Sequence, residues 1–146
     1  MDLLYQSTDG IEVALGTSST ESTFVTRPFS DFVLTSVDDP DCMDLDVADT
    51  ISIPNSNAFI DLDGDCMPDL FLTMTNQGTS YYRVLIQRLI ENGGITEHKY
   101  CLTATQDQIV ESGVTMPLIE LGDFNRDSMI DIAFFTPDGT VTVLYN

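Results

Sequence analysis

Positively charged residues are scarce: the 146-residue chain has 5 Lys and Arg against 24 Asp and Glu, a formal net charge of −19. Such a chain repels the phosphates of nucleic acids and anionic lipid headgroups, and no basic patch offsets this repulsion. The sequence also contains no run of about 18 apolar residues that could cross a membrane. We therefore expect no nucleic-acid binding, and membrane attachment only through an anchor of a parent protein outside this segment.

Cysteine and histidine are also limited. Cys42, Cys66 and Cys101 form no Cys-x-x-Cys pair, so a zinc or redox centre has few available ligands. Cys42 and Cys101 could pair in an oxidising compartment, and the sequence leaves this open. The single histidine, His98, has no GxSxG motif beside it, which predicts an exposed strand residue. We expect no enzymatic activity from this chain.

Apolar residues, in contrast, make up 42% of the chain and recur in short alternating stretches. Three pairs of such stretches flank turn sequences, namely Thr-Asp-Gly at 8–10, Asn-Gly-Gly at 92–94 and Pro-Asp-Gly at 137–139. These are hairpin signals, and they predict an all-β fold with almost no helix. In the second hairpin, Tyr81 and Tyr82 should alternate, with one ring packed inside and the other exposed.

One acidic segment occurs twice. FIDLDGDCMPDLFLT at 59–73 aligns with IELGDFNRDSMIDIAFFT at 119–136, at an offset of 62 residues from Asp61 to Asp123. A partial third copy begins at Asp2, which aligns with Asp131. Such periods, with room for about four antiparallel strands each, predict consecutive blades of a β-propeller. We expect strands two to four of one blade in about 1–50, a full blade in about 51–112 and three strands of the next in about 113–146.

Each acidic segment places oxygen atoms at alternating positions. Side chains two residues apart in an extended stretch point the same way, so their carboxylates can converge on one hard cation. The predicted ligands are Asp61, Asp63, Asp65, Met67 and Asp69 in the first loop, and Asp123, Asn125, Asp127, Met129 and Asp131 in the second, each Met through its backbone carbonyl.

Such oxygen-only sets indicate about two Ca²⁺ sites, with manganese as an alternative. The first loop should bind more tightly, because Asn125 takes the place of a carboxylate in the second. The alternative that both loops are solvated acidic turns without metal stays open. In either case the closing carboxylate stands at position 9, so each loop should join two strands as a hairpin.

The pattern Asp-x-Asp/Asn-x-Asp-x-x-x-Asp between apolar strands resembles the calcium loop of FG-GAP repeats, the blades of integrin α-subunit propellers. The longer string PNSNAFIDLDGDCMPDLFLT at 54–73 resembles the T-cell immunomodulatory protein family, whose members carry FG-GAP repeats in a large extracellular region above one membrane-spanning helix. The resemblance implies a seven-bladed propeller in the parent, with structural metal loops joining the first two strands of a blade. The chain departs from that pattern at position 6, where Cys66 and Ser128 replace the usual glycine.

A further acidic segment, DDPDCMDLDVAD at 38–49, occurs once. We expect a solvated loop between blades, with a third metal site or a surface for a basic partner as alternatives. Altogether the sequence predicts a calcium-stabilised, non-enzymatic propeller segment at the cell surface or outside the cell, for protein recognition or adhesion. Its partners would be the remaining blades and an unknown protein ligand. The alternative is the accessory propeller of a carbohydrate- or lipid-active enzyme.

Overall fold

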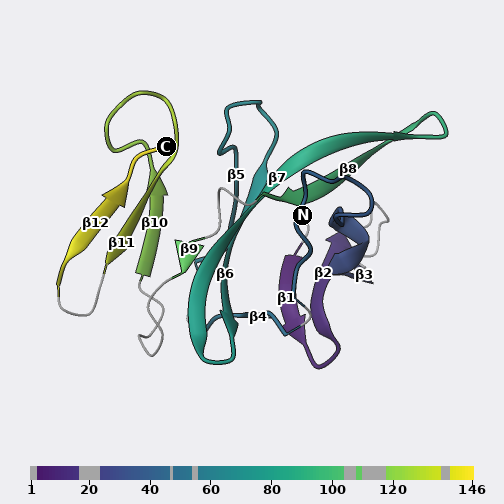
Figure 1. Ribbon diagram of the computed structural model, residues 1–146, viewed down its shortest axis with the longest axis horizontal. Helices are drawn as coiled ribbons and strands as arrows, with labels where there is room; N and C mark the ends of the chain where they lie inside the picture. Colours follow the sequence, from purple (N-terminus) through teal and green to yellow (C-terminus); the bar gives the residue numbers. More distant parts are fainter. Residues whose placement is uncertain are drawn as a thin grey trace.

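The computed structural model describes residues 3–16, 24–46, 48–53, 56–103, 108–109, 118–135 and 139–146. These residues form an all-β fold of antiparallel sheets, as the sequence predicts (Figure 1). Their helical content is η1 (Phe29–Phe32), a 3-10 turn that falls far short of the length needed to cross a membrane.

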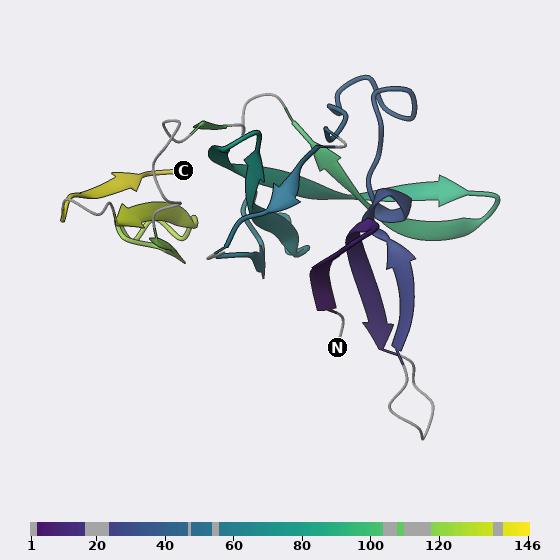
Figure 2. The ribbon, with the colours of Figure 1, turned by 90° about the horizontal axis from the view of Figure 1, so that it is seen from below.

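Three sheets follow one another along the chain (Figures 1 and 2). The first has the order β1 (Leu3–Ser7), β2 (Gly10–Gly16), β3 (Phe24–Pro28). The central sheet contains β4 (Thr50–Ile51), β5 (Ala58–Ile60), β6 (Asp69–Asn76), β7 (Thr79–Asn92), β8 (Ile95–Leu102) and β9 (Gln108–Ile109). The third has the order β10 (Leu118–Gly122), β11 (Asp131–Phe135), β12 (Val141–Leu144).

The central sheet has six strands but is four strands wide. β4 and β5 both pair with β6, at positions where the other edge of β6 is occupied by β7. β8 and β9 likewise both pair with β7, on the edge opposite β6. Each outer strand is therefore interrupted, and the sheet is an antiparallel meander of four successive paths.

The predicted hairpins occur where the described residues cover them. Ser7 pairs with Gly10 at the β1–β2 turn, and Asn92 pairs with Ile95 at the β7–β8 turn. In the latter turn Gly93 and Gly94 both have positive φ, of 59° and 83°, a conformation that glycine adopts without steric cost. The turn predicted between β11 and β12 includes residues 136–138, which lie outside the described part of the chain.

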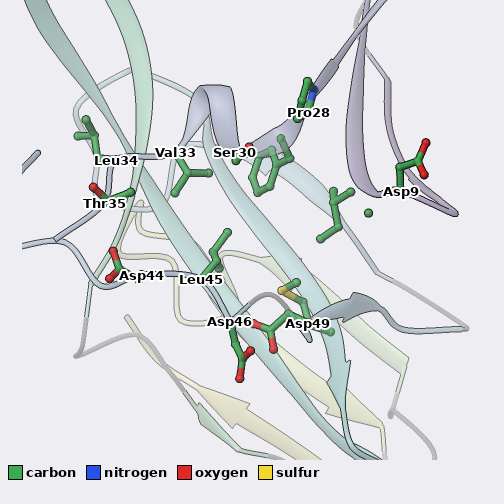
Figure 3. A pocket seen from close by; sticks show the side chains of 14 residues that line it. Asp9, Pro28, Ser30, Val33, Leu34, Thr35, Asp44, Leu45, Asp46 and Asp49 are labelled. Carbon is green, nitrogen blue, oxygen red and sulfur yellow. The ribbon is translucent and has the colours of Figure 1, made fainter. Parts of the chain in front are cut away.

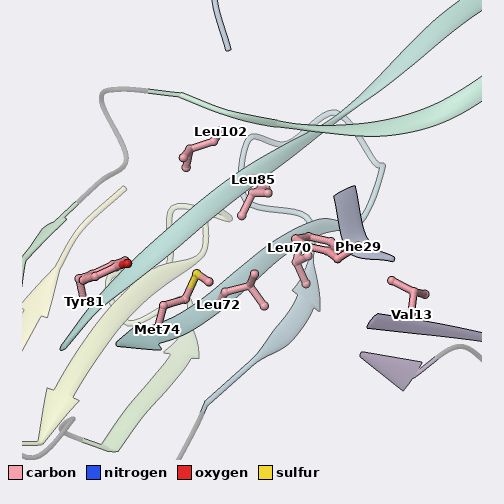
Figure 4. Packing of buried hydrophobic residues seen from close by; sticks show 8 residues of the cluster. All are labelled: Val13, Phe29, Leu70, Leu72, Met74, Tyr81, Leu85 and Leu102. Atoms are coloured by element: carbon pink, nitrogen blue, oxygen red, sulfur yellow. The ribbon is translucent and has the colours of Figure 1, made fainter. Parts of the chain in front are cut away.

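Both faces of the central sheet are covered. On one face, alternate residues of β6 and β7 pack with Val13 of β2 and with Phe29 of η1 (Figure 4). On the opposite face, Phe71 and Val84 pack with Ile119 of the third sheet. The central sheet therefore lies between the other two, and its buried residues hold the three sheets together.

Two adjacent tyrosines show the effect of this double cover. Tyr81 belongs to the cluster on the first face, and Tyr82 belongs to the cluster on the second. Their exposed fractions are 5% and 4%. The prediction that one of them is exposed is wrong, because the third sheet covers the face on which Tyr82 lies. The Phe134 ring packs at a tilt against that of Tyr82, with the ring centroids 5.7 Å apart.

The segment that follows η1 runs along the free edge of β8. The amide of Leu34 donates to the carbonyl of Tyr100 at 2.8 Å, and the amide of Met43 donates to the carbonyl of Leu102 at 2.6 Å. Between these contacts a disulfide joins Cys42 to Cys101, with the two Cα atoms 5.2 Å apart. The pairing that the sequence left open is therefore present, whereas Cys66 is free and exposed.

The acidic segment 38–49 is not uniformly solvated. Asp49 is only 7% exposed, and its Oδ1 accepts hydrogen bonds from the Tyr81 hydroxyl and from Asn76 Nδ2. Arg83 Nη2 lies 3.7 Å from its Oδ2. The prediction of a solvated loop is wrong at this end, because all three partners come from β6 and β7, about thirty residues away along the chain.

Candidate metal centres

The two predicted metal loops occupy equivalent places in the fold. The first joins β5 to β6, and Ile60 pairs with Asp69 across its base. The second joins β10 to β11, and Gly122 pairs with Asp131 in the same way. Each loop thus connects neighbouring antiparallel strands, and the hairpin connection expected from the position-9 carboxylate is confirmed.

The first loop is folded around its own carboxylates. Asp61 accepts hydrogen bonds from the amides of Gly64 at 2.8 Å and Cys66 at 2.9 Å. Asp63 Oδ1 accepts from the amide of Asp65 at 3.2 Å, and Asp65 Oδ1 accepts from the amide two residues further on at 2.7 Å. These bonds curl the backbone so that the side chains of positions 1, 3 and 5 face a common centre.

The second loop repeats these four hydrogen bonds. Asp123 Oδ2 accepts from the amide of Ser128 at 3.0 Å, and its Oδ1 accepts from the amide of Arg126 at 2.5 Å. Asn125 Oδ1 accepts from the amide of Asp127 at 3.0 Å. The two segments have different residues at five of their nine positions, so the shared geometry follows from the acidic positions they have in common.

The position-9 aspartates are the buried ends of the loops. Asp69 and Asp131 are both 0% exposed. Asp69 Oδ2 accepts from the amides of Leu62 at 2.8 Å and Asp63 at 3.3 Å, and its Oδ1 accepts from the amide of Gln87 in β7 at 2.8 Å. Burial raises the pKa of the Asp69 carboxyl, whereas the Gln87 and Leu62 amides act in the opposite direction.

Three of the predicted first-loop ligands come together. Asp61, Asp63 and Asp65 present carboxylate oxygens that all lie within 4.8 Å of one another, the one such group among the described residues. Oδ2 of Asp63 and of Asp65 accepts no hydrogen bond there and so remains available. Asp69 is not a member of this group, because its oxygens face backbone amides. This donor set fits a hard cation such as Ca²⁺.

The second loop offers a weaker donor set. Asn125 contributes a neutral amide where the first loop has a carboxylate, and its Nδ2 donates to Asp127 Oδ2 at 2.7 Å. Asp127 Oδ1 accepts from the amide of Met129 at 2.8 Å, so both of its oxygens are engaged. The carbonyl roles predicted for Met67 and Met129 remain predictions.

Four loop residues have left-handed backbone conformations, at equivalent positions of the two loops. Gly64 and Arg126 at position 4 have φ of 82° and 66°, and Cys66 and Ser128 at position 6 have φ of 68° and 74°. The tight turn that glycine usually makes at position 6 is therefore present without glycine. A side chain in this conformation costs about 1 kcal/mol or more.

This strain gives a prediction at Ser128, whose side chain makes no hydrogen bond among the described residues. Replacing Ser128 with glycine should raise the free energy of unfolding by about 1 kcal/mol, because glycine adopts positive φ freely. Ser128→Ala is the matched control and should bring no gain, since it keeps the Cβ atom. Urea unfolding in EGTA measures both, and a glycine variant no more stable than the alanine variant would contradict the prediction.

The two loops also lie against each other, a feature that sequence reasoning missed. Asn146 donates from its amide nitrogen to Asp131 Oδ1 at 3.1 Å and from Nδ2 to the carbonyl of Leu62 at 2.6 Å. Met129 Sδ lies 3.9 Å from the point where a side chain at Gly64 would begin. The repeat spacing shows that the loops are equivalent, but only the packing of the sheets brings them together.

The class that emerges is an antiparallel all-β protein with two equivalent acidic hairpin loops. Among known proteins, the chain is similar to two named T-cell immunomodulatory protein homolog. It is 31% identical to the one from Plasmodium yoelii yoelii over 88 residues, and 33% identical to the one from Plasmodium falciparum (isolate 3D7) over 84 residues.

These alignments cover 56% and 58% of this chain, respectively, and 11% of each relative. The chain thus spans about a tenth of the length of the curated relatives it matches. No family model and no solved structure matches the chain. The two similarities support the resemblance to the T-cell immunomodulatory protein family that the motif at 54–73 indicates.

Proposed function

We propose that this chain is a calcium-stabilised β-propeller segment that acts outside the cell or at its surface in protein recognition or adhesion, with structural metal loops. The observation that carries the proposal is the repetition of four side-chain-to-backbone hydrogen bonds in the two acidic loops, from Asp61 to Asp69 and from Asp123 to Asp131. Loops that share these hydrogen bonds at one repeat spacing are expected of repeated blades rather than of accidental acidic turns.

The sheets are compatible with propeller blades, which we propose to be of the FG-GAP type. The four paths of the central sheet correspond to the full blade proposed at about 51–112, and each loop joins the first two paths of its sheet. The three-stranded sheets on either side would be parts of the neighbouring blades. The remaining blades of a parent protein are then the first partners of this chain, because a blade buries its faces only against neighbours.

An extracellular setting is supported by the Cys42–Cys101 disulfide. Such bonds persist in oxidising compartments and are rare where glutathione keeps thiols reduced. Extracellular calcium is also plentiful enough for modules that bind it at about 0.1 to 1 mM, so a structural ion would remain bound there. In the cytosol the same sites would be mostly empty.

Calcium bound by Asp61, Asp63 and Asp65 would neutralise carboxylates that otherwise repel one another. The second loop would hold its ion through Asp123, Asn125 and Asp127. The chain's own part is to hold these oxygens in place through the loop amides and to keep Asp69 anchored in the core. Because calcium would bind the folded state and not the unfolded chain, its binding free energy would add to the free energy of unfolding.

The test is the thermal unfolding midpoint in EGTA and in 5 mM calcium. With calcium near ten times the dissociation constant, two sites should add about 3 kcal/mol, a rise of roughly 6 to 12 °C. In Asp65→Ala with Asp127→Ala this rise should disappear. Asp39→Ala with Asp41→Ala removes the same charge from an exposed loop and should keep it. A midpoint that calcium leaves unchanged in the wild type would mean that the loops are solvated turns.

A further inference from the structure

A pocket separate from the metal loops lies between the first sheet and the central sheet (Figure 3). The β1–β2 turn forms one wall, η1 and residues 33–35 form another, and residues 44–46 with Asp49 close the third side. Met74 of β6 lies at the base. Its volume of about 340 Å³ is within the range of pockets that take a small ligand or a side chain.

The interior of this pocket is apolar. Phe29 and Met74 are 3% and 0% exposed, and Leu34 beside them is 6% exposed. Ile11 and Leu45 are partly buried against the same core cluster. Methylene groups of an incoming side chain would find apolar contacts here that water does not provide.

The rim of the pocket is strongly acidic. Three exposed carboxylates line it, those of Asp9, Asp44 and Asp46, with the buried Asp49 as a fourth beneath them, and no Lys, Arg or His is among the lining residues that the structure describes. Their potential adds to that of a chain whose net charge is −19. An occupant that complements this pocket must therefore combine an apolar body with a positive charge.

Two of these carboxylates are already held in position. Asp44 accepts hydrogen bonds from the amide of Ser36 at 2.8 Å and from its hydroxyl at 3.0 Å. Asp46 accepts from the amide of Ala48 and from Asn76 Nδ2, both at 2.9 Å. These bonds lower the pKa of Asp46, and the bond from the Ala48 amide has the larger effect. Asp46 is therefore ionised at neutral pH. Side chains ordered before binding lose little conformational entropy when a ligand arrives.

The fourth carboxylate has an oxygen without a donor. The Asp49 side chain is 1% exposed, and its Oδ2 accepts no hydrogen bond from the described residues. Arg83 Nη2, at 3.7 Å, forms an ion pair with this oxygen but is too far away to donate a hydrogen bond to it. Buried carboxylate oxygens almost always have a donor, so Asp49 leaves one acceptor unused beside the pocket.

From this geometry we propose that the pocket docks a lysine or arginine side chain of a protein partner. The aliphatic stem packs on the partly buried Ile11, Val33 and Leu45, and the charged head meets the rim carboxylates. The inference deepens the proposed recognition function by giving its partner a chemistry. A metal ion suits the pocket less well, because its carboxylates do not form a group of close oxygens as Asp61, Asp63 and Asp65 do. The proposal locates the basic-partner surface, an alternative for residues 38–49 in the sequence analysis, at this pocket.

The probe is Nα-acetyl-lysine methylamide, titrated into the ¹⁵N-labelled chain in 5 mM calcium and followed by NMR. Saturable shifts should be confined to residues 9–11, 33–35 and 44–46. Nα-acetyl-norleucine methylamide, which has the stem without the charge, should bind at least fivefold more weakly. Asp9→Asn with Asp44→Asn should weaken lysine binding at least fivefold, whereas Asp39→Asn with Asp41→Asn, at two residues that do not line the pocket, should change it less than twofold.

Three results would overturn the inference. Equal binding of the norleucine probe would show an apolar pocket without charge recognition. Equal weakening in both double variants would show a general effect of net charge, and absence of saturable shifts would show that no basic side chain docks. The calcium-dependent rise of the unfolding midpoint is measured independently of these titrations, so failure of the docking proposal and failure of the proposed function are distinguishable.

Discussion

Asp69→Ala should lower the free energy of unfolding by about 3 to 5 kcal/mol even when no calcium is present. The carboxylate is 0% exposed and accepts the backbone amides of Leu62, Asp63 and Gln87. Alanine leaves these three donors without an acceptor in a place that water reaches poorly. Since one donor belongs to β7 and two belong to the loop, the substitution also detaches the loop from the central sheet.

The matched control is Asp63→Ala in the same loop. Asp63 is exposed and accepts one hydrogen bond, from the amide of Asp65, so in EGTA its loss should cost less than about 1 kcal/mol. In calcium the loss caused by Asp63→Ala should be larger than in EGTA, because this substitution removes a predicted metal ligand and should abolish the calcium response of the first site. Urea unfolding in EGTA and in calcium therefore separates the anchoring role of Asp69 from the ligand role of Asp63.

Asp69→Asn keeps the experiment informative if the alanine variant does not fold. The amide oxygen of asparagine can accept from one side of the site, while its NH₂ group faces a backbone donor on the other. We expect a loss between those of the control and of alanine. A stability equal to that of the wild type in EGTA would contradict the assignment of Asp69 as the buried anchor of the loop.

The candidate metal loops could be located from the sequence because their signal is local. Nine consecutive positions contain the predicted ligands, and the apolar stretches on either side indicate the flanking strands. The second copy at a fixed offset then identifies equivalent residues without any knowledge of packing. The long-range partner of the anchor, Gln87, could not be found in this way, because it lies 18 residues from Asp69 and donates through its backbone.

Features that depend on contacts between sheets were missed for the same reason. Tyr82 alternates with Tyr81 as the strand pattern requires, but its burial depends on a third sheet that follows later in the chain. Asp49 stands among other aspartates and has the local sequence of a solvated loop. Its burial depends on Asn76, Tyr81 and Arg83, and no local pattern connects these residues.

The Cys42–Cys101 bridge has the other large expected effect. It closes a loop with a sequence separation of 59 residues. In the chain-entropy model, removing it raises the conformational entropy of the unfolded chain and so lowers the free energy of unfolding by about 4 kcal/mol. The double variant Cys42→Ala with Cys101→Ala should therefore have a free energy of unfolding lower by about that amount. Urea unfolding measures it, in a Cys66→Ala background that prevents exchange with the free thiol. Reducing the Cys66→Ala protein with a thiol reagent should produce the same loss by an independent route.

The same urea unfolding data test whether the bridge acts on the folded state or on the unfolded chain. The backbone bonds from Leu34 to Tyr100 and from Met43 to Leu102 hold the segment on β8 without the bridge, so the folded structure should persist. The effect then lies in the unfolded chain, which becomes more expanded, and the urea dependence of the unfolding free energy should become steeper. A loss below about 1 kcal/mol with an unchanged slope would mean that the bridge does not constrain the unfolded chain. A large loss with a disrupted β8 edge would instead make the bridge a requirement of the fold itself.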